Sequence, residues 1–259
     1  AVGALGEKSS QTTITNGTGA SSDNTGGEWP GAVYVYKRTG TTWAQEAYIK
    51  AANTNERDFF GKSVALDNDT LVVGAEGEDS NQTSITNGTS ASSDNSNPDT
   101  GAVYVYKRTG TTWAQEAYIK ASNNDGLGYT PYSYENYGAS VALSGDTLVV
   151  GSYGEDSNQT TITMGTSASS DNSYRGVTGA VYVYKRTESS WAQEAYIKAS
   201  NNVDGLNFSI SVDISGLTIV AGARNEGSNQ TTITNGTSSS SDTSSAQSGA
   251  VYVYTFTGE

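Results

Sequence analysis

The sequence contains no cysteine, no histidine and only three prolines among its 259 residues. Without cysteine there are no disulfides and no thiolate metal sites, and without histidine there is no Ser-His-Asp triad and no His-ligated zinc or haem. Basic residues are also few, 14 against 27 acidic ones, and the net charge of −13 argues against nucleic acid as a partner. No apolar run approaches the ~20 residues of a membrane helix, so we expect no membrane insertion.

What the sequence does contain is one unit that repeats. Gly-Ala-Val-Tyr-Val-Tyr occurs at 31–36, 101–106, 179–184 and 249–254, so successive copies start 70, 78 and 70 residues apart. Three copies are followed by Trp-Ala-Gln-Glu-Ala-Tyr-Ile-Lys-Ala, and two further apolar segments precede each complete unit. These segments are short, rich in Val and Tyr, and bounded by Gly, Asn, Asp and Ser, which is typical of β-strands. Each unit therefore reads as four strands.

The links between the strands indicate how the four strands pair. Residues 67–69, 109–111 and 144–146 have the length of hairpin turns, which predicts antiparallel meanders. The second and third strands carry almost no polar face, and a strand that is apolar on both faces must be covered on both faces. Blades stacked radially provide that cover, so we predict an all-β fold, a β-propeller of four-stranded antiparallel blades.

The chain begins at a second strand and ends after a third, which amounts to about 3.5 blades. We assign a partial blade to 1–52 (strands 2–4), full blades to 53–122 and 123–200, and a partial blade to 201–259 (strands 1–3). We expect the chain to be a fragment of a longer propeller. The alternative is that its end blades are completed by another molecule.

The fourth strand alternates Gln, Glu and Lys with Ala, Tyr and Ile, as suits an outer edge that resists pairing with other molecules. Nine of the 14 basic residues occupy the repeated Lys-Arg and Ile-Lys positions of the third and fourth strands. We interpret these lysines and arginines as a solvated edge.

Two short signatures flank the first and second strands of each unit. They are Phe60-Gly61 with Val73-Gly74-Ala75, Tyr137-Gly138 with Val150-Gly151-Ser152, and Asn207-Phe208-Ser209 with Ala221-Gly222-Ala223. These pairs resemble FG-GAP repeats, the repeats of the integrin α-subunit propeller and of many secreted bacterial proteins, although the third pair has lost its first Gly. The resemblance implies a seven-bladed propeller, a secreted or cell-surface location, and adhesion or ligand recognition, often with calcium.

One departure limits what this resemblance implies. Family members that bind calcium usually use a longer Asp-rich loop between the first and second strands. Here that link is only 67–70, 144–147 or 215–218, which is too short to wrap a cation with six to eight oxygens. The usual calcium site of the family is absent.

The link between the second and third strands is the unusual one, at about 25 residues in every copy, far longer than a hairpin loop. Its acids are candidate ligands for Ca²⁺, because carboxylates among Ser, Thr and Asn oxygens suit that hard cation. The candidates are Glu78, Asp79 and Asp94 in one loop, and Glu155, Asp156 and Asp171 in the next. The alternative is that these acids cap turns and keep the surface soluble.

The first long loop contains the alternating segment Thr13-Ile14-Thr15 followed by Asn16-Gly17, which favours a small hairpin corner with a type I′ turn. Ile85, Ile162 and Ile233 occupy the matching place, and we expect each to pin its loop to the blade as an apolar contact. The same loops carry Asn-x-Thr sequences, which mark glycan acceptors only in a secreted protein. The candidate sites are Asn81, Asn158 and Asn229.

Most of the 17 tyrosines belong to the repeated strands, where we expect them to pack between blades. Four others cluster beside Pro131, in the insertion that explains the 78-residue spacing. They form a candidate contact surface for sugar or protein, with packing on their own blade as the alternative: Tyr129, Tyr132, Tyr134 and Tyr137.

We predict a non-enzymatic extracellular module for adhesion, ligand recognition or surface assembly, because near-identical blades offer equivalent sites and no unique constellation. Its partners would be extracellular protein or carbohydrate, further copies of itself, or missing blades of the same protein. One alternative is a filament subunit joined by strand or blade complementation. Another is a carboxylate-dependent glycosidase or lyase, which needs two carboxylates about 5 to 9 Å apart at one asymmetric site.

Overall fold

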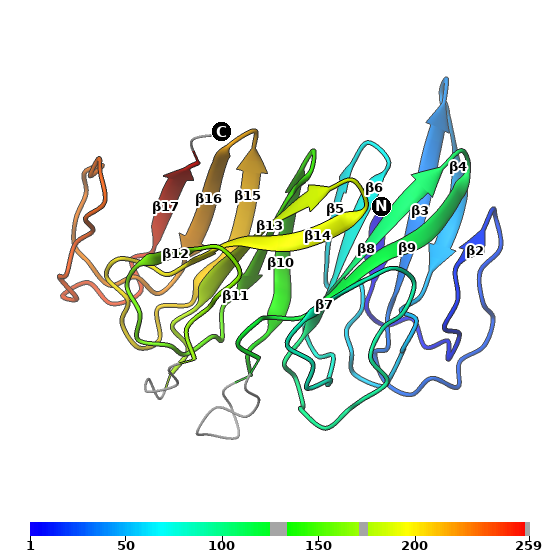
Figure 1. Cartoon of the computed structure of the whole chain (residues 1–259), viewed down its shortest axis with the longest axis horizontal. Coiled ribbons are helices and arrows are strands. Elements are labelled where there is room, and N and C mark those ends of the chain that lie inside the picture. Colours follow the sequence, from blue (N-terminus) through cyan, green and yellow to red (C-terminus); the bar gives the residue numbers. More distant parts are fainter. Residues whose placement is uncertain (125–133, 171–175, 257–259) are drawn as a thin grey trace.

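The computed structural model describes residues 1–124, 134–170 and 176–256, and in these residues it contains seventeen β-strands and no helix. The strands form four antiparallel sheets, which we call blades 1 to 4 in chain order, and which lie side by side in Figure 1. In spatial order, blade 1 is β1 (Val2–Ala4), β3 (Ala32–Thr39), β4 (Thr42–Ile49) and β2 (Thr15–Asn16). Blade 2 is β5 (Ser63–Asp67), β6 (Thr70–Ala75), β8 (Ala102–Thr109), β9 (Thr112–Ile119) and β7 (Ile85–Asn87).

Blade 3 repeats the order of blade 2, and blade 4 contains three strands. Blade 3 is β10 (Tyr137–Ser144), β11 (Thr147–Ser152), β13 (Ala180–Thr187), β14 (Ser190–Ile197) and β12 (Ile162–Met164). Blade 4 is β15 (Phe208–Ser215), β16 (Thr218–Ala223) and β17 (Ala250–Thr255). The all-β fold of antiparallel meanders predicted from the sequence is confirmed. In the described part of the chain there is no helix that could span a membrane.

The predicted outer edge is wrong in one respect, because the long loop adds a fifth strand outside the fourth. In blade 2, β7 pairs antiparallel with β9, with Ile85 opposite Ile119, and Gly88 N donates to the Glu116 carbonyl at 2.6 Å. β2 and β12 pair in the same way with β4 and β14. The alternating Thr and Ile of the loop supply a short strand, so the fourth strand is covered and does not form the edge.

The Asn-Gly pair does not make the type I′ turn expected from the sequence. Such a turn needs positive φ at both central residues, but only the glycines have it, with φ of 100° at Gly17 and 114° at Gly88. Asn16 and Asn87 instead end the fifth strand and bridge to the next blade. Trp191 N donates to Asn87 Oδ1 at 2.8 Å, and Asn87 Nδ2 donates back to the Trp191 carbonyl at 3.4 Å.

The loop isoleucine packs against the next blade only where that blade has a fourth strand. Ile14 and Ile85 pack against the clusters between blades 1 and 2 and between blades 2 and 3. Ile162 is 48% exposed and Ile233 is 89% exposed, so the prediction is wrong for these two. The reason is that blade 4 has no fourth strand in the described residues, so nothing there covers Ile162 and the segment around Ile233 has no strand to pair with.

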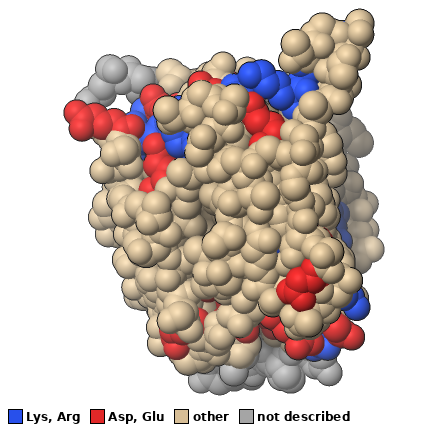
Figure 2. Space-filling model, turned by 90° about the vertical axis from the view of Figure 1, so that its right-hand side faces the viewer, with Lys and Arg blue, Asp and Glu red and all other residues tan. Residues whose placement is uncertain are grey.

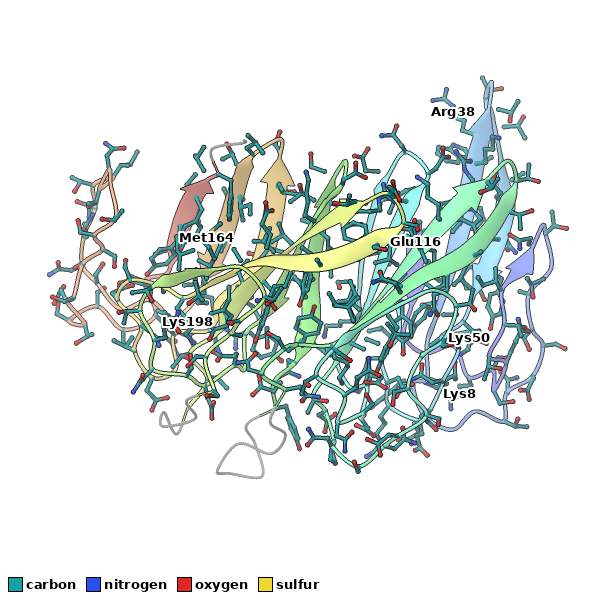
Figure 3. All side chains as sticks on the ribbon, viewed as in Figure 1. Lys8, Arg38, Lys50, Glu116, Met164 and Lys198 are labelled. Carbon is teal, nitrogen blue, oxygen red and sulfur yellow. The ribbon has the colours of Figure 1, made fainter. Side chains whose placement is uncertain are left out.

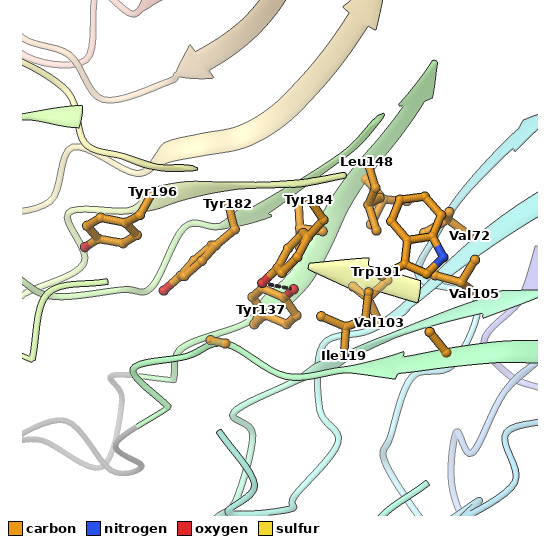
Figure 4. Packing of buried hydrophobic residues seen from close by; sticks show 14 of the residues in the cluster. Val72, Val103, Val105, Ile119, Tyr137, Leu148, Tyr182, Tyr184, Trp191 and Tyr196 are labelled. Atoms are coloured by element: carbon orange, nitrogen blue, oxygen red, sulfur yellow. Dashed lines mark hydrogen bonds between the residues drawn. The ribbon is translucent and has the colours of Figure 1, made fainter. Parts of the chain in front are cut away.

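Three apolar clusters fill the spaces between successive blades, and they explain the Val-Tyr-Val-Tyr pattern. Successive side chains on a strand point to opposite faces. Val103 and Val105 therefore belong to the cluster against blade 3, whereas Tyr104 and Tyr106 belong to the cluster against blade 1. Figure 4 shows the cluster between blades 2 and 3, to which blade 3 contributes Tyr182 and Tyr184 and blade 2 contributes Val103 and Val105. Both faces of the middle strands are covered, as predicted.

The paired glycine signatures mark the place where two blades meet most closely. A Cβ built on Gly74 would overlap the carbonyl oxygen of Gly138 in the next blade, and Gly138 itself has a φ of 86°. Gly3 and Gly61 form the same contact between blades 1 and 2. The backbones of neighbouring blades touch here, and there is no room for a side chain at Gly74 or Gly3.

Candidate functional site

The long loops leave the sheets at their lower end in Figure 1. A glutamate near the start of the loop is buried in each of blades 2, 3 and 4: Glu78, Glu155 and Glu226. Glu78 is only 1% exposed. Its Oε2 accepts from Lys120 Nζ at 2.8 Å, and its Oε1 accepts from Asn53 Nδ2 at 2.9 Å. The carboxylate is therefore committed to a buried network and is not presented to solvent.

The same ion pair recurs in two other blades. Glu155 accepts from Lys198 Nζ, and Glu7 accepts from Lys50 Nζ at 2.9 Å. Lys50 and Lys198 lie near the lower end of their sheets in Figure 3. Burial lowers the pKa of Lys120, because desolvation disfavours the ammonium form. The interpretation of the repeated Ile-Lys lysines as a solvated edge is wrong, since all three are 1% exposed.

The arginines of the Lys-Arg pairs also have specific partners. Arg108 contacts Asp69 of its own blade at 2.6 Å and Glu46 in β4 of the preceding blade at 3.1 Å. Trp113 Nε1 donates to the same Glu46 at 3.2 Å. These residues connect the outer rims of neighbouring blades, and the recurrence of Arg, Trp and Glu at fixed repeat positions is the sequence signal that points to them.

The later acids of the loops fold the loop on itself. Asp94 Oδ2 accepts from Asn81 N at 2.9 Å and from Ser96 Oγ at 2.9 Å, and these hydrogen bonds lower its pKa. Asp79 Oδ1 accepts from Asp99 N at 2.8 Å. Asp156 is 4% exposed, and Asp171 lies outside the described residues. The turn-capping alternative accounts for the contacts of Asp79 and Asp94.

Within the described ranges, no three acidic side chains gather into a group that could hold a metal ion. The structure brings Glu78 and Asp79 together at the start of one loop but uses both in internal contacts. Calcium binding remains a prediction, and the buried glutamates do not support it.

The predicted aromatic surface is wrong for one of its four tyrosines. Tyr137 is fully buried and donates to Tyr184 Oη at 2.7 Å (Figure 4). It takes the place that Phe60 has in the preceding blade, so as a ligand contact it is a wrong prediction. Tyr134 is 36% exposed and remains available for contact. Tyr129 and Tyr132 lie outside the described residues.

The candidate glycan acceptors lie on the surface. Asn81, Asn158 and Asn229 are all exposed, each a few residues into its loop. Asn16 and Asn87 also stand in Asn-x-Thr sequences, but their side chains bridge to Trp113 and Trp191 of the next blade. The structure thus separates two groups of asparagines that the sequence alone presents as equivalent.

Antiparallel meanders packed face to face, with a glycine contact at each junction, define a protein built from β-propeller blades. The FG-GAP repeat family matches residues 43–106 and 113–184, together just over half of the chain. The chain therefore belongs to the FG-GAP repeat family. Each match begins in the outer strand of one blade and ends in the third strand of the next, so it spans one glycine junction. No curated protein matches the chain.

Proposed function

We propose that this chain is a non-enzymatic module for ligand recognition or adhesion in a secreted or cell-surface protein. Membership of the FG-GAP repeat family supports this role, since such repeats are typical of extracellular proteins. The observation that carries the proposal is the set of long loops, which are ordered by their own hydrogen bonds and still expose neutral polar side chains.

The order of the loops comes from two contacts that recur. Gln82 Nε2 donates to the Ser84 carbonyl and to Thr86 Oγ1, both at 2.9 Å, and Gln11 and Gln159 repeat this arrangement. Aspartates close the other arm of the loop, as Asp94 does. The hydroxyl and amide groups left on the surface are held in place before binding, and such groups can recognise carbohydrate or extended protein by hydrogen bonds at low entropic cost.

Binding to glycan and matrix-protein arrays tests this proposal. The loop variant carries Thr13→Lys, Ser84→Lys and Thr161→Lys, all at exposed positions that leave the Asn-x-Thr sequences intact. The matched control places three lysines in the exposed turns at the opposite end, Thr41→Lys, Thr111→Lys and Ser189→Lys. We expect the loop variant to lose binding at least tenfold, about 1.4 kcal/mol, and the control to retain it. Equal binding by both variants would refute a role for the loops.

A second candidate function is assembly with further blades through the open faces of blades 1 and 4. Trp43 is 64% exposed, whereas Trp113 and Trp191, at the same repeat position, are 2% exposed because a preceding blade covers them. Val251 and Val253 are 70% and 63% exposed, although their counterparts in blades 2 and 3 are buried. Figure 2 shows the open face at the blade 1 end, where charged side chains lie toward the top and bottom and the centre is uncharged.

These two faces are the two halves of an interface that the molecule makes three times internally, so each face fits a further blade, either of a second copy or of the same protein. Sedimentation at rising concentration tests this. We expect association that Trp43→Glu or Val253→Asp abolishes and that Ile233→Asp, on an exposed loop residue, leaves unchanged. A monomer at all concentrations would exclude assembly between copies.

A further inference from the structure

Three lysines are buried as deeply as the apolar core. Lysine normally keeps its ammonium group in water, yet Lys120 is 1% exposed, and its Nζ donates to Glu78 Oε2 and to Thr100 Oγ1, both at 2.8 Å. A buried ion pair alone is weakly stabilising at best, because the desolvation penalty offsets the attraction. The neighbours of this pair are therefore of interest.

The same glutamate also holds a carboxamide. Glu78 Oε1 accepts from Asn53 Nδ2 at 2.9 Å, and Tyr104 Oη donates to Asn53 Oδ1 at 2.6 Å. One carboxylate thus accepts a hydrogen bond from a lysine amine on one oxygen and from a side-chain amide on the other. The carbonyl of that amide is polarised by the hydroxyl of a fully buried tyrosine.

This arrangement is repeated in the next blade and is incomplete in the end blades. Glu155 accepts from Lys198 Nζ and from Asn123 Nδ2 at 3.2 Å, and Tyr182 Oη donates to Asn123 Oδ1 at 2.6 Å. In blade 1, Glu7 pairs with Lys50 and no Asn contact to Glu7 is present in the described residues. In blade 4, Asn201 contacts Glu226 at 3.1 Å, and no lysine joins them in the described range.

We propose that each of the two complete clusters forms an intramolecular amide bond, from Lys120 Nζ to Asn53 Cγ and from Lys198 Nζ to Asn123 Cγ. The amine attacks the amide carbon, the new C–N bond forms, and the bond from Cγ to Nδ2 breaks, so that one ammonia leaves per crosslink. No oxidant, reductant or cofactor is needed.

The neighbouring groups supply what this reaction requires. Only the neutral amine is a nucleophile, and burial shifts Lys120 toward that form by lowering its pKa. Glu78, already hydrogen-bonded to both reactants, takes the proton from the amine and delivers it to the departing nitrogen. Tyr104, whose pKa burial raises well above its usual value, stays protonated and donates to the oxyanion that develops on Asn53 Oδ1.

Each bond would close a whole blade. Asn53 precedes the first strand of blade 2, and Lys120 follows its fourth strand, so the crosslink joins the start of the blade to its outer end. Asn123 and Lys198 bracket blade 3 in the same way. A covalent ring of this kind restricts the unfolded chain, as a disulfide would, in a protein that has no cysteine.

The intact mass of the folded full chain tests the proposal. Loss of two ammonia molecules lowers the mass by about 34 Da relative to the sequence, and digestion yields branched peptides in which 53 is joined to 120 and 123 to 198. Asn-Gly succinimides also lose ammonia, so mapping by tandem mass spectrometry after mild alkaline treatment, which opens succinimides only, is required. Lys50 and Asn201 should remain unmodified as internal controls.

Glu78→Gln removes the proton carrier with little change in shape, and we expect it to abolish the 53–120 crosslink and to leave the 123–198 crosslink intact. Circular dichroism of the variant checks that it is folded. A folded wild-type chain with the full sequence mass would overturn the proposal and leave the clusters as ion pairs only. A single crosslink would confirm the chemistry for that blade and overturn it for the other.

Discussion

Replacing Ser209 by glycine should stabilise the protein. Ser209 stands where the earlier copies have Gly61 and Gly138, and it has the same left-handed backbone, with a φ of 69°. It is fully buried, and its Oγ has no hydrogen-bond partner in the described structure. At Gly61 and Gly138, a Cβ would lie only 2.7 and 2.6 Å from the carbonyl oxygens of Ala32 and Ala102. The serine is therefore strained, crowded and unsatisfied at once.

The expected gain can be estimated from these terms. The left-handed conformation costs a residue with a Cβ ~1–2 kcal/mol, and a buried unpaired hydroxyl costs ~1–3 kcal/mol. Glycine gives back ~0.5–1 kcal/mol through the greater freedom of the unfolded chain. We expect Ser209→Gly to raise the free energy of unfolding by ~1–4 kcal/mol, with ~2–4 °C in Tm for each kcal/mol in a chain of this size.

Urea denaturation and thermal melting of the wild type, Ser209→Gly and Gly138→Ser check this estimate. The matched control is Gly138→Ser, which introduces the same serine into the junction between blades 2 and 3 and should destabilise by a similar amount. If Ser209→Gly lowers stability, or if Gly138→Ser is neutral, then the glycine junction does not work as the structure indicates.

Three further outcomes follow. Burial raises the pKa of Asp58 to about 8, so its stabilising contribution is complete below pH ~4. That contribution is lost as pH rises toward 8, by up to ~1.4 kcal/mol per pH unit. Asp58→Asn should remove this loss in denaturation measured from pH 4 to 9, and an unchanged dependence of stability on pH would contradict the prediction. Asn87→Ala should cost ~1–2 kcal/mol in the same assay by breaking the bridge to Trp191, whereas Met164→Ala, at the matching but 61% exposed position, should change stability by less than ~0.5 kcal/mol. Because Glu78 and Glu155 are buried away from solvent, we expect EDTA to shift Tm by less than ~1 °C. A larger fall would show that the loops hold a cation.

Much of the fold can be predicted from the sequence because each strand of the repeat occurs three or four times. The period of Val-Tyr-Val-Tyr predicts strands that are covered on both faces, and the hairpin-length links predict the antiparallel meander. The glycine signatures identify the family. Their physical meaning, contact between the backbones of Gly74 and Gly138, becomes visible only when the blades are placed together.

What the sequence determined by itself is therefore the repeat, the strands and the class of fold, because these depend on local patterns and short links. Only the tertiary structure decided the partners of the polar residues. Lysines that read as a solvated edge lie in the core beside Glu78 and Glu155, loop asparagines bridge blades, and Tyr137 fills an apolar junction. These contacts join residues up to 104 positions apart, and the burial that makes them favourable arises only when neighbouring blades exclude water from both faces of a sheet.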